Sequence, residues 1–174
     1  QIGNTDRALE YFQQGIKAKN DFYLCHYRLG CLLHYKGNIK KALNSYINAL
    51  KSNPDCAQSY ARKGLIYNEL GDIKKSIKSF KKALMLNPEW LEVHNNLGIL
   101  LSNNKNFEEA IYHFEKCVAL NPNSIDNYNN LGMAHKEKGN TSEALKIYKK
   151  ALQIEPNFAE VNNNIGNIFL EQTD

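Results

Sequence analysis

Apolar residues recur along the chain at helical spacing, in pairs of segments. Residues 91–124 show the pattern most clearly, with two apolar stripes separated by the polar run Asn103-Asn104-Lys105-Asn106. The sequence Asn121-Pro122 ends the second stripe, because the residue before a proline disfavours helical backbone angles. The stripes are formed by Leu91, Val93, Leu97, Leu100 and Leu101, and by Phe107, Ala110, Ile111, Phe114 and Val118. The pattern predicts two helices joined by a short turn.

The same pair of segments recurs with a period of 34 residues, which is visible in several columns of equivalent positions. One column contains the four prolines, Pro54, Pro88, Pro122 and Pro156. The glycine columns are Gly30, Gly64, Gly98, Gly132 and Gly166, and Gly37, Gly71 and Gly139 with Lys105 in the gap. An aromatic column contains Phe12, Tyr46, Phe80, Phe114 and Tyr148, and small residues such as Ala42 and Ala49 form two further columns. The period predicts an all-α solenoid in which each pair of helices packs against the next.

The period also predicts the helix bounds and the domain organisation. We expect a single array over residues 1–174, with full repeats at 23–56, 57–90, 91–124 and 125–158 and partial repeats at 1–22 and 159–174. Because the chain begins with Gln1, we expect it to be a segment of a longer protein. The predicted helices span about 5–18, 23–36, 39–51, 57–70, 73–85, 91–104, 107–119, 125–138, 141–153 and 159–172.

The columns also predict how the helices pack. Gly98 lies in the middle of a predicted helix, where glycine costs about 1 kcal/mol relative to alanine. We therefore expect a neighbouring helix to approach closely at this column, with the aromatic column filling the space between paired helices. At the end of the chain, we expect Ile168 and Phe169 to have no following helix to cover them. Either a longer chain continues there, or copies associate end to end.

Taken together, these columns resemble the tetratricopeptide repeat over the whole chain. Leu29-Gly30, Leu97-Gly98 and Leu131-Gly132 match the Leu-Gly pair of that motif, Ile165-Gly166 is a close variant, and Lys63-Gly64 departs from it. His26 and His94 replace the aromatic residue that opens the motif, which favours a packing role for them. The resemblance implies a right-handed superhelix of about ten antiparallel helices, with the first helix of each repeat lining a concave groove.

Two columns on the first helices are candidates for binding a peptide in that groove. The asparagine side chain offers two donors and one acceptor oxygen, which match the N–H and C=O groups of an extended peptide. Arginine suits carboxylate or phosphate groups. The alternative explanation is a compositional bias towards asparagine. The candidate residues are Arg28, Arg62, Asn96, Asn130 and Asn164 in one column, and Asn95, Asn129 and Asn163 in the column before it. The asparagine columns also resemble the repeats of O-GlcNAc transferases, which hold extended substrate chains.

The charges are unevenly distributed along the chain. Residues 1–87 contain 15 basic and 6 acidic residues, whereas residues 88–174 contain 7 and 12, so their net charges are +9 and −5. Drift between repeats could explain this asymmetry, and so could selection for an asymmetric partner. Five lysines, Lys74, Lys75, Lys78, Lys81 and Lys82, lie together on a predicted second helix. We interpret them as a solvated outer face rather than a nucleic-acid site, because no aromatic platform accompanies them in the sequence.

The remaining chemistry excludes several classes of protein. No apolar run approaches the roughly 20 residues of a membrane span, and no catalytic motif of the zinc-protease, phosphate-loop or serine-hydrolase type occurs. The four cysteines lack zinc-ligand spacing, which predicts reduced thiols in helices and an intracellular, cytoplasmic protein.

We therefore predict a non-enzymatic interaction scaffold, without cofactor or metal, that binds an extended or helical segment of another protein. We expect neither nucleic acid nor a membrane as its partner. One alternative is the substrate-recruiting arm of a larger enzyme, such as a glycosyltransferase resembling O-GlcNAc transferase. The other is end-to-end self-association.

Overall fold

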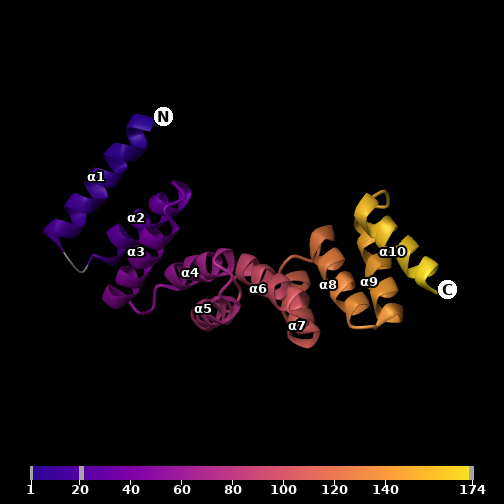
Figure 1. The fold of residues 1–174 in the computed structure, drawn as a ribbon. Coiled ribbons are helices and arrows are strands. Elements are labelled where there is room, and N and C mark those ends of the chain that lie inside the picture. The colour runs from indigo at the N-terminus through magenta and orange to yellow at the C-terminus, as the bar shows by residue number, and fades with distance from the viewer. Residues whose placement is uncertain (1, 20–21, 173–174) are drawn as a thin grey trace. The chain divides into compact units, whose positions relative to one another are not determined.

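The computed structural model describes residues 2–19 and 22–172, and these residues form ten helices and no strand (Figure 1). The predicted all-α fold is confirmed. The later nine helices end within one residue of the predicted bounds, and the first begins three residues earlier than predicted. The helices are α1 (Ile2–Ala18), α2 (Tyr23–Tyr35), α3 (Ile39–Ser52), α4 (Ala57–Glu69), α5 (Ile73–Leu86), α6 (Leu91–Asn103), α7 (Phe107–Leu120), α8 (Ile125–Glu137), α9 (Thr141–Ile154) and α10 (Ala159–Glu171).

The proline column ends the second helix of each full repeat by constraining the residue before it. A proline disfavours helical angles at the preceding residue. The four residues before the prolines accordingly leave the helix, with φ between −140° and −138° and ψ between 84° and 99°. They are Asn53, Asn87, Asn121 and Glu155.

The second glycine column forms the turns between paired helices. Gly37, Gly71 and Gly139 have φ values of 73°, 73° and 89°, which glycine adopts without steric cost. Lys105, which fills the gap in the column, has φ 60°. The turn geometry is therefore kept in this repeat even though a lysine replaces the glycine.

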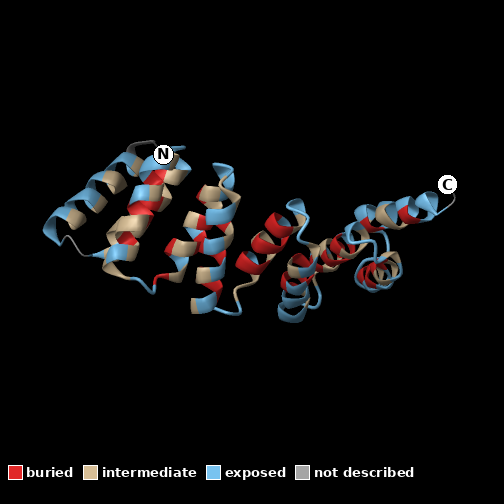
Figure 2. Cartoon of the chain, turned by 60° about the horizontal axis from the view of Figure 1, so that its bottom comes forward, coloured by how far each residue is buried: buried red, intermediate tan, exposed pale blue. Residues whose placement is uncertain are grey.

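Contacts divide the chain into two compact units, Gln1–Pro88 and Glu89–Asp174, which we describe separately as the N-terminal and C-terminal units. The division falls at the end of the second full repeat. The single array predicted over residues 1–174 stays a prediction. Each unit consists of antiparallel helix pairs whose buried residues face one another (Figure 2).

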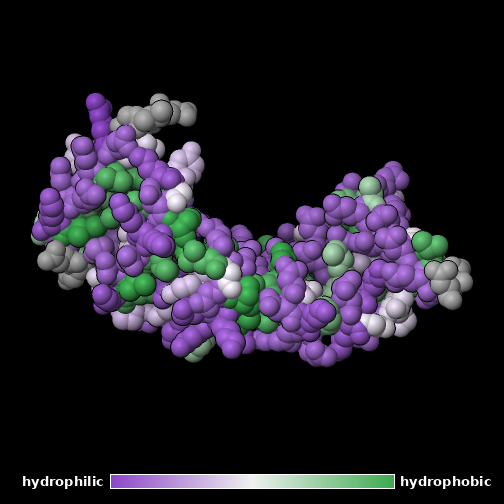
Figure 3. All heavy atoms as spheres, in the orientation of Figure 1, coloured by the Kyte–Doolittle hydropathy of each residue, from purple (hydrophilic) through white to green (hydrophobic). Residues whose placement is uncertain are grey.

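In the N-terminal unit, α2 packs against α3, α4 against α5, and α3 against α4. The buried core joins α2, α3 and α4 through Leu33, Ala42, Tyr46 and Ile66. Leu9 of α1 packs against this core. On the face of this unit shown in Figure 3, the side chains are mainly hydrophilic, with patches of apolar side chains among them.

In the C-terminal unit, α6 packs against α7, α8 against both α7 and α9, and α10 against α9. Ile168 of α10 is fully buried with Tyr148 and Val161, so the prediction that it lies uncovered was wrong. It points back towards α9 and needs no following helix. Phe169 is 55% exposed, in agreement with the prediction for that residue.

The first glycine column allows the close helix approach that the sequence predicted. A Cβ atom on Gly98 would lie 2.7 Å from the ring of Phe114, which is 2% exposed. Gly30, Gly64 and Gly132 face Tyr46, Phe80 and Tyr148 in the same way. Gly166 of α10 has no such neighbour within 4 Å among the described residues. Residues of the first glycine column thus pack directly against the rings of the aromatic column.

Candidate functional site

In the C-terminal unit, the asparagine pairs lie in the middle of α6, α8 and α10, and they bond to one another diagonally. Asn130 Nδ2 donates to Asn95 Oδ1 over 3.0 Å. Asn164 Nδ2 donates to Asn129 Oδ1 over 2.9 Å, and Asn129 Nδ2 donates to Glu160 Oε2 over 3.3 Å. The second asparagine of α8 and that of α10 therefore each tie their helix to the preceding first helix. The asparagine side chains therefore use within the protein some of the donors and acceptors that we predicted would bind a peptide.

The remaining capacity differs from residue to residue. Asn129 is 6% exposed, which leaves little of it for a partner. Asn96 is half-buried and Asn163 is exposed, and neither side chain forms a hydrogen bond with any residue that the structure describes. Asn130 and Asn164 each use one N–H, so a second N–H and the carbonyl oxygen remain on each side chain.

Two further rows flank the asparagines, because residues three or four apart share a helix face. On one side are three exposed carboxylates, Glu92, Asp126 and Glu160. On the other are Ile99 and Met133, which are 40% and 45% exposed. The first helices of this unit therefore present acidic, amide and apolar side chains in parallel rows.

In the N-terminal unit, the predicted arginines lie exposed on α2 and α4 and share one tyrosine. The guanidinium of Arg28 lies 5.9 Å from the ring centroid of Tyr27. Burial raises the pKa of Tyr27, and a hydrogen bond with Arg62 opposes that rise. Tyr27 thus connects the two arginines across adjacent first helices.

Arg62 also lines a pocket of about 390 Å³ together with Cys31, His34, Tyr35 and Tyr46. Tyr46 is fully buried, and its hydroxyl has no hydrogen-bond partner of ordinary geometry among the described residues, with the Cys31 thiol as its polar neighbour. Burial and then the neighbouring Cys31 thiol raise the pKa of Tyr46, so the hydroxyl stays protonated and can donate. A guanidinium and an unpaired hydroxyl in one pocket suit a carboxylate.

Sequence reasoning missed two features of these surfaces. It assigned Tyr46 to packing alone, because Tyr46 belongs to the aromatic column. It also missed the diagonal bonds, although the bonded pairs are 35 residues apart, one more than the repeat period. That spacing places the two side chains on the first helices of adjacent repeats, offset by one residue. The sequence could therefore have predicted these bonds.

Other candidate chemistry is sparse among the described residues. They contain no group of three or more His, Cys, Asp or Glu side chains that could hold a metal ion, and no helix long and apolar enough to cross a membrane. His94 is buried, and its Nδ1 lies 2.8 Å from Nδ1 of His113, so it joins α6 to α7.

All four cysteines are free thiols. Cys25, Cys31 and Cys117 lie in helices as predicted, whereas Cys56 immediately precedes α4. Burial raises the pKa of the Cys117 thiol to about 11, so it is protonated at neutral pH.

Two family models, both described as tetratricopeptide repeat, match residues 24–56 and 57–89 and residues 90–156. The chain belongs to the tetratricopeptide repeat family. No curated protein sequence matches it. The family models and the solved structures below give no support to the closer resemblance to O-GlcNAc transferases.

Solved structures of other tetratricopeptide repeat proteins are similar in fold. MamA is 24% identical over 91% of this chain and 93% of its own, with a TM-score of 0.81. YrrB, described as a tetratricopeptide repeat protein with an unusual peptide-binding site, is 21% identical over 94% and 84%, with a TM-score of 0.81. A tetratricopeptide repeat protein from Parabacteroides merdae is 21% identical over 99% and 68%, with a TM-score of 0.81.

Proposed function

We propose that this tetratricopeptide repeat protein is a non-enzymatic scaffold that binds a segment of another protein along the first helices of its repeats. The peptide-binding site described for YrrB supports a peptide as the ligand class. The observation that carries the proposal is the set of asparagine pairs on α6, α8 and α10, between an acidic and an apolar row. Such a surface offers main-chain hydrogen bonds, ion pairs and apolar contact to one extended segment.

In the C-terminal unit, the segment is expected to carry basic and apolar side chains. Asn96 contributes donors and an acceptor that no described residue uses, and Asn130 and Asn164 contribute their remaining N–H and carbonyl groups. Glu92 and Asp126 attract basic side chains. Neighbouring helices lie about 8–10 Å apart, so one helix is met about every third residue of an extended chain.

In the N-terminal unit, the pocket beside Arg62 is expected to receive an acidic side chain. The guanidinium and the Tyr46 hydroxyl would both donate to its carboxylate, and the pocket would satisfy the hydroxyl that has no partner within the described part of the protein.

Single substitutions test the surface of the C-terminal unit more sharply than a triple asparagine variant, because Asn130 and Asn164 also hold helices together. The probe is a fluorescein-labelled peptide of alternating Lys and Leu, with binding read by anisotropy. Asn96→Ala is expected to weaken binding by about fivefold, the value of one hydrogen bond near 1 kcal/mol. The pair Glu92→Gln and Asp126→Asn is expected to weaken it by about tenfold.

The matched control is Asn157→Ala in an exposed turn outside the surface, which is expected to bind like the wild type. If Asn96→Ala and the carboxylate pair both bind the peptide as the wild type does, the proposal is wrong. The alternative of a substrate-recruiting arm in a larger enzyme would use the same surface and has no separate support in this chain. End-to-end self-association also stays a prediction.

A further inference from the structure

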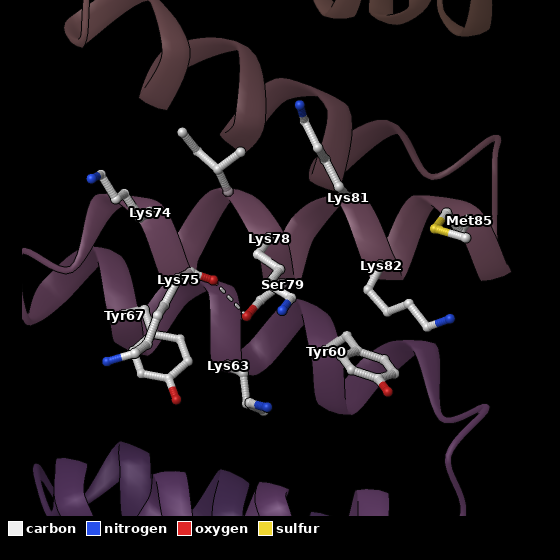
Figure 4. Close-up of a pocket in the computed structure, with 11 residues that line it drawn as sticks. Tyr60, Lys63, Tyr67, Lys74, Lys75, Lys78, Ser79, Lys81, Lys82 and Met85 are labelled. Atoms are coloured by element: carbon white, nitrogen blue, oxygen red, sulfur yellow. Dashed lines mark hydrogen bonds between the residues drawn. The ribbon is translucent and has the colours of Figure 1, made fainter.

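A second surface of the N-terminal unit carries a strong positive charge that the proposed function does not use. It is a groove of about 710 Å³ along α4 and α5, which we name the basic groove. Six of its lining residues are lysines: Lys63, Lys74, Lys75, Lys78, Lys81 and Lys82. In Figure 4, Tyr60, Lys63 and Tyr67 follow one side of α4, next to Lys75, Lys78 and Lys82 of α5. Arg62 lies on a different side of α4, so this groove is distinct from the pocket described above.

Four of the six lysines in the basic groove are not neutralised by any residue that the structure describes. Lys75 pairs with Asp72 over 2.7 Å. Lys63, Lys74, Lys78 and Lys82 form no ion pair with any described residue. Burial, and then the charge of Lys78, lower the pKa of Lys63, which shows that these cations lie close enough to repel one another. A ligand that supplies negative charge would relieve this repulsion.

Two tyrosines give the groove an apolar wall. The ammonium group of Lys63 lies 5.7 Å from the ring centroid of Tyr60, and that of Lys75 lies 5.5 Å from the centroid of Tyr67. Met85, 72% exposed, lies at one end of the groove. The sequence showed no aromatic platform beside these lysines, and the fold places two tyrosine rings next to them. The tyrosines come from the preceding helix, and only the fold brings them together with α5.

The arrangement favours a protein ligand over nucleic acid. Stacking of bases needs open aromatic faces, whereas each of these rings already has an ammonium group over one face. Lysine binds carboxylates and phosphates alike as a point charge, so the choice between these ligands rests on the aromatic rings. Tyr60 and Tyr67 are seven residues, or about 10 Å, apart along α4, which matches about three residues of extended chain.

We propose that the basic groove docks a carboxylate-rich segment of a partner protein, with Lys63, Lys78 and Lys82 contacting its carboxylates and an apolar side chain seated against Tyr60 and Tyr67. This second docking surface takes a ligand of opposite charge to the one proposed for the C-terminal unit. The protein would then hold two segments of different chemistry at once.

The test uses a fluorescein-labelled peptide of alternating Glu and Leu, with anisotropy as the readout and the full chain as the protein. Replacing Glu by Gln in the peptide is expected to abolish binding. The variant Lys78→Gln with Lys82→Gln is expected to bind the acidic peptide about tenfold more weakly. Circular dichroism of each variant verifies that the helices are retained.

The matched control is Lys149→Gln with Lys150→Gln on α9. These two lysines are exposed, and Lys150 lies at the position equivalent to Lys82, two repeats later. The change in net charge is therefore the same in both variants, and one of the two substituted helix positions is matched. The control is expected to change the affinity less than twofold. If both pairs of substitutions weaken binding equally, the attraction is general and the proposal is wrong.

Two further probes distinguish the class of ligand. An oligouridylate and vesicles containing phosphatidylserine are tested as competitors against the acidic peptide. At a comparable concentration of charged groups, neither competitor is expected to displace the acidic peptide. The variant Tyr67→Ala is expected to weaken binding of the acidic peptide by about fivefold. If oligouridylate binds more tightly than the peptide and is equally sensitive to Lys78→Gln with Lys82→Gln, the groove is a nucleic-acid site and the proposal is overturned. Stronger binding to the vesicles would overturn it in the same way.

Discussion

At the scale of single residues, a glycine at one position of the repeat is required for packing in one repeat and can be replaced in another. Gly98→Ala would place a methyl group 2.7 Å from the buried Phe114 ring, so we expect the free energy of unfolding to fall by about 1–2 kcal/mol. Gly166→Ala meets no described atom within 4 Å, and we expect a gain of about 0.5–1 kcal/mol from helix propensity. Urea unfolding followed by circular dichroism measures both. A loss of stability in both variants would contradict this explanation of the column.

Lys63 takes the place of the leucine that the equivalent positions 29, 97 and 131 contain. It is half-buried, and burial lowers its pKa. We expect Lys63→Leu to raise the free energy of unfolding by about 1 kcal/mol, because apolar burial replaces a desolvated charge. Chemical unfolding measures the gain. The exposed Lys149→Leu is the control, and a similar gain there would contradict the argument.

The same variant has a predictable pH dependence. Because the pKa of Lys63 is lower in the folded than in the unfolded protein, folding is penalised while the side chain is protonated in both states. The penalty disappears as the pH rises from the lowered pKa towards the ordinary value of 10.5. The advantage of Lys63→Leu over the wild type should therefore narrow in this range. A stabilised variant that also binds acidic peptides less well would indicate that Lys63 is retained for binding.

At the scale of helices, the asparagine pairs act as connectors between first helices. Asn129 of α8 contacts two residues of α10, Glu160 and Asn164. We expect Asn129→Ala to weaken the docking of α10 by about 1–2 kcal/mol, since each hydrogen bond contributes about 1 kcal/mol. Amide hydrogen exchange should then become faster in α10 and stay unchanged in α6.

Asn163→Ala provides the control for this measurement, because the Asn163 side chain is exposed and forms no hydrogen bond with a described residue. Exchange in α10 should match the wild type in that variant. If Asn129→Ala leaves the protection of α10 unchanged, the diagonal bonds contribute nothing to helix packing, and the asparagines would be free to act on a ligand alone.

The helix pairs could be predicted from the sequence because local backbone rules determine them. A proline such as Pro122 constrains the residue before it, and a glycine such as Gly71 permits the turn conformation, wherever they occur. The binding surfaces were harder to predict because they depend on side chains from different helices. Tyr60 and Tyr67 fit the pattern of packing residues, and the sequence did not show that they flank the lysines of α5.

At the scale of the whole molecule, a net charge of +4 conceals two units of opposite charge. The N-terminal unit contains 15 basic and 6 acidic residues, and the C-terminal unit contains 7 and 12. The basic groove lies in the first unit, and the row of Glu92, Asp126 and Glu160 lies in the second. The net charge of each unit thus has the same sign as the surface proposed to bind a ligand in that unit.

We therefore expect the acidic and the basic peptide to bind one molecule at the same time. Because each is attracted by a different unit, saturating amounts of one should leave the affinity for the other within about twofold. Amide hydrogen exchange should show protection by the Glu-Leu peptide in α4 and α5, and by the Lys-Leu peptide in α6, α8 and α10. At about 1 M salt, where screening acts over roughly 3 Å, both protections should fall sharply. Protection of the same helices by both peptides would show that the chain has one adaptable surface instead of two surfaces selected by charge.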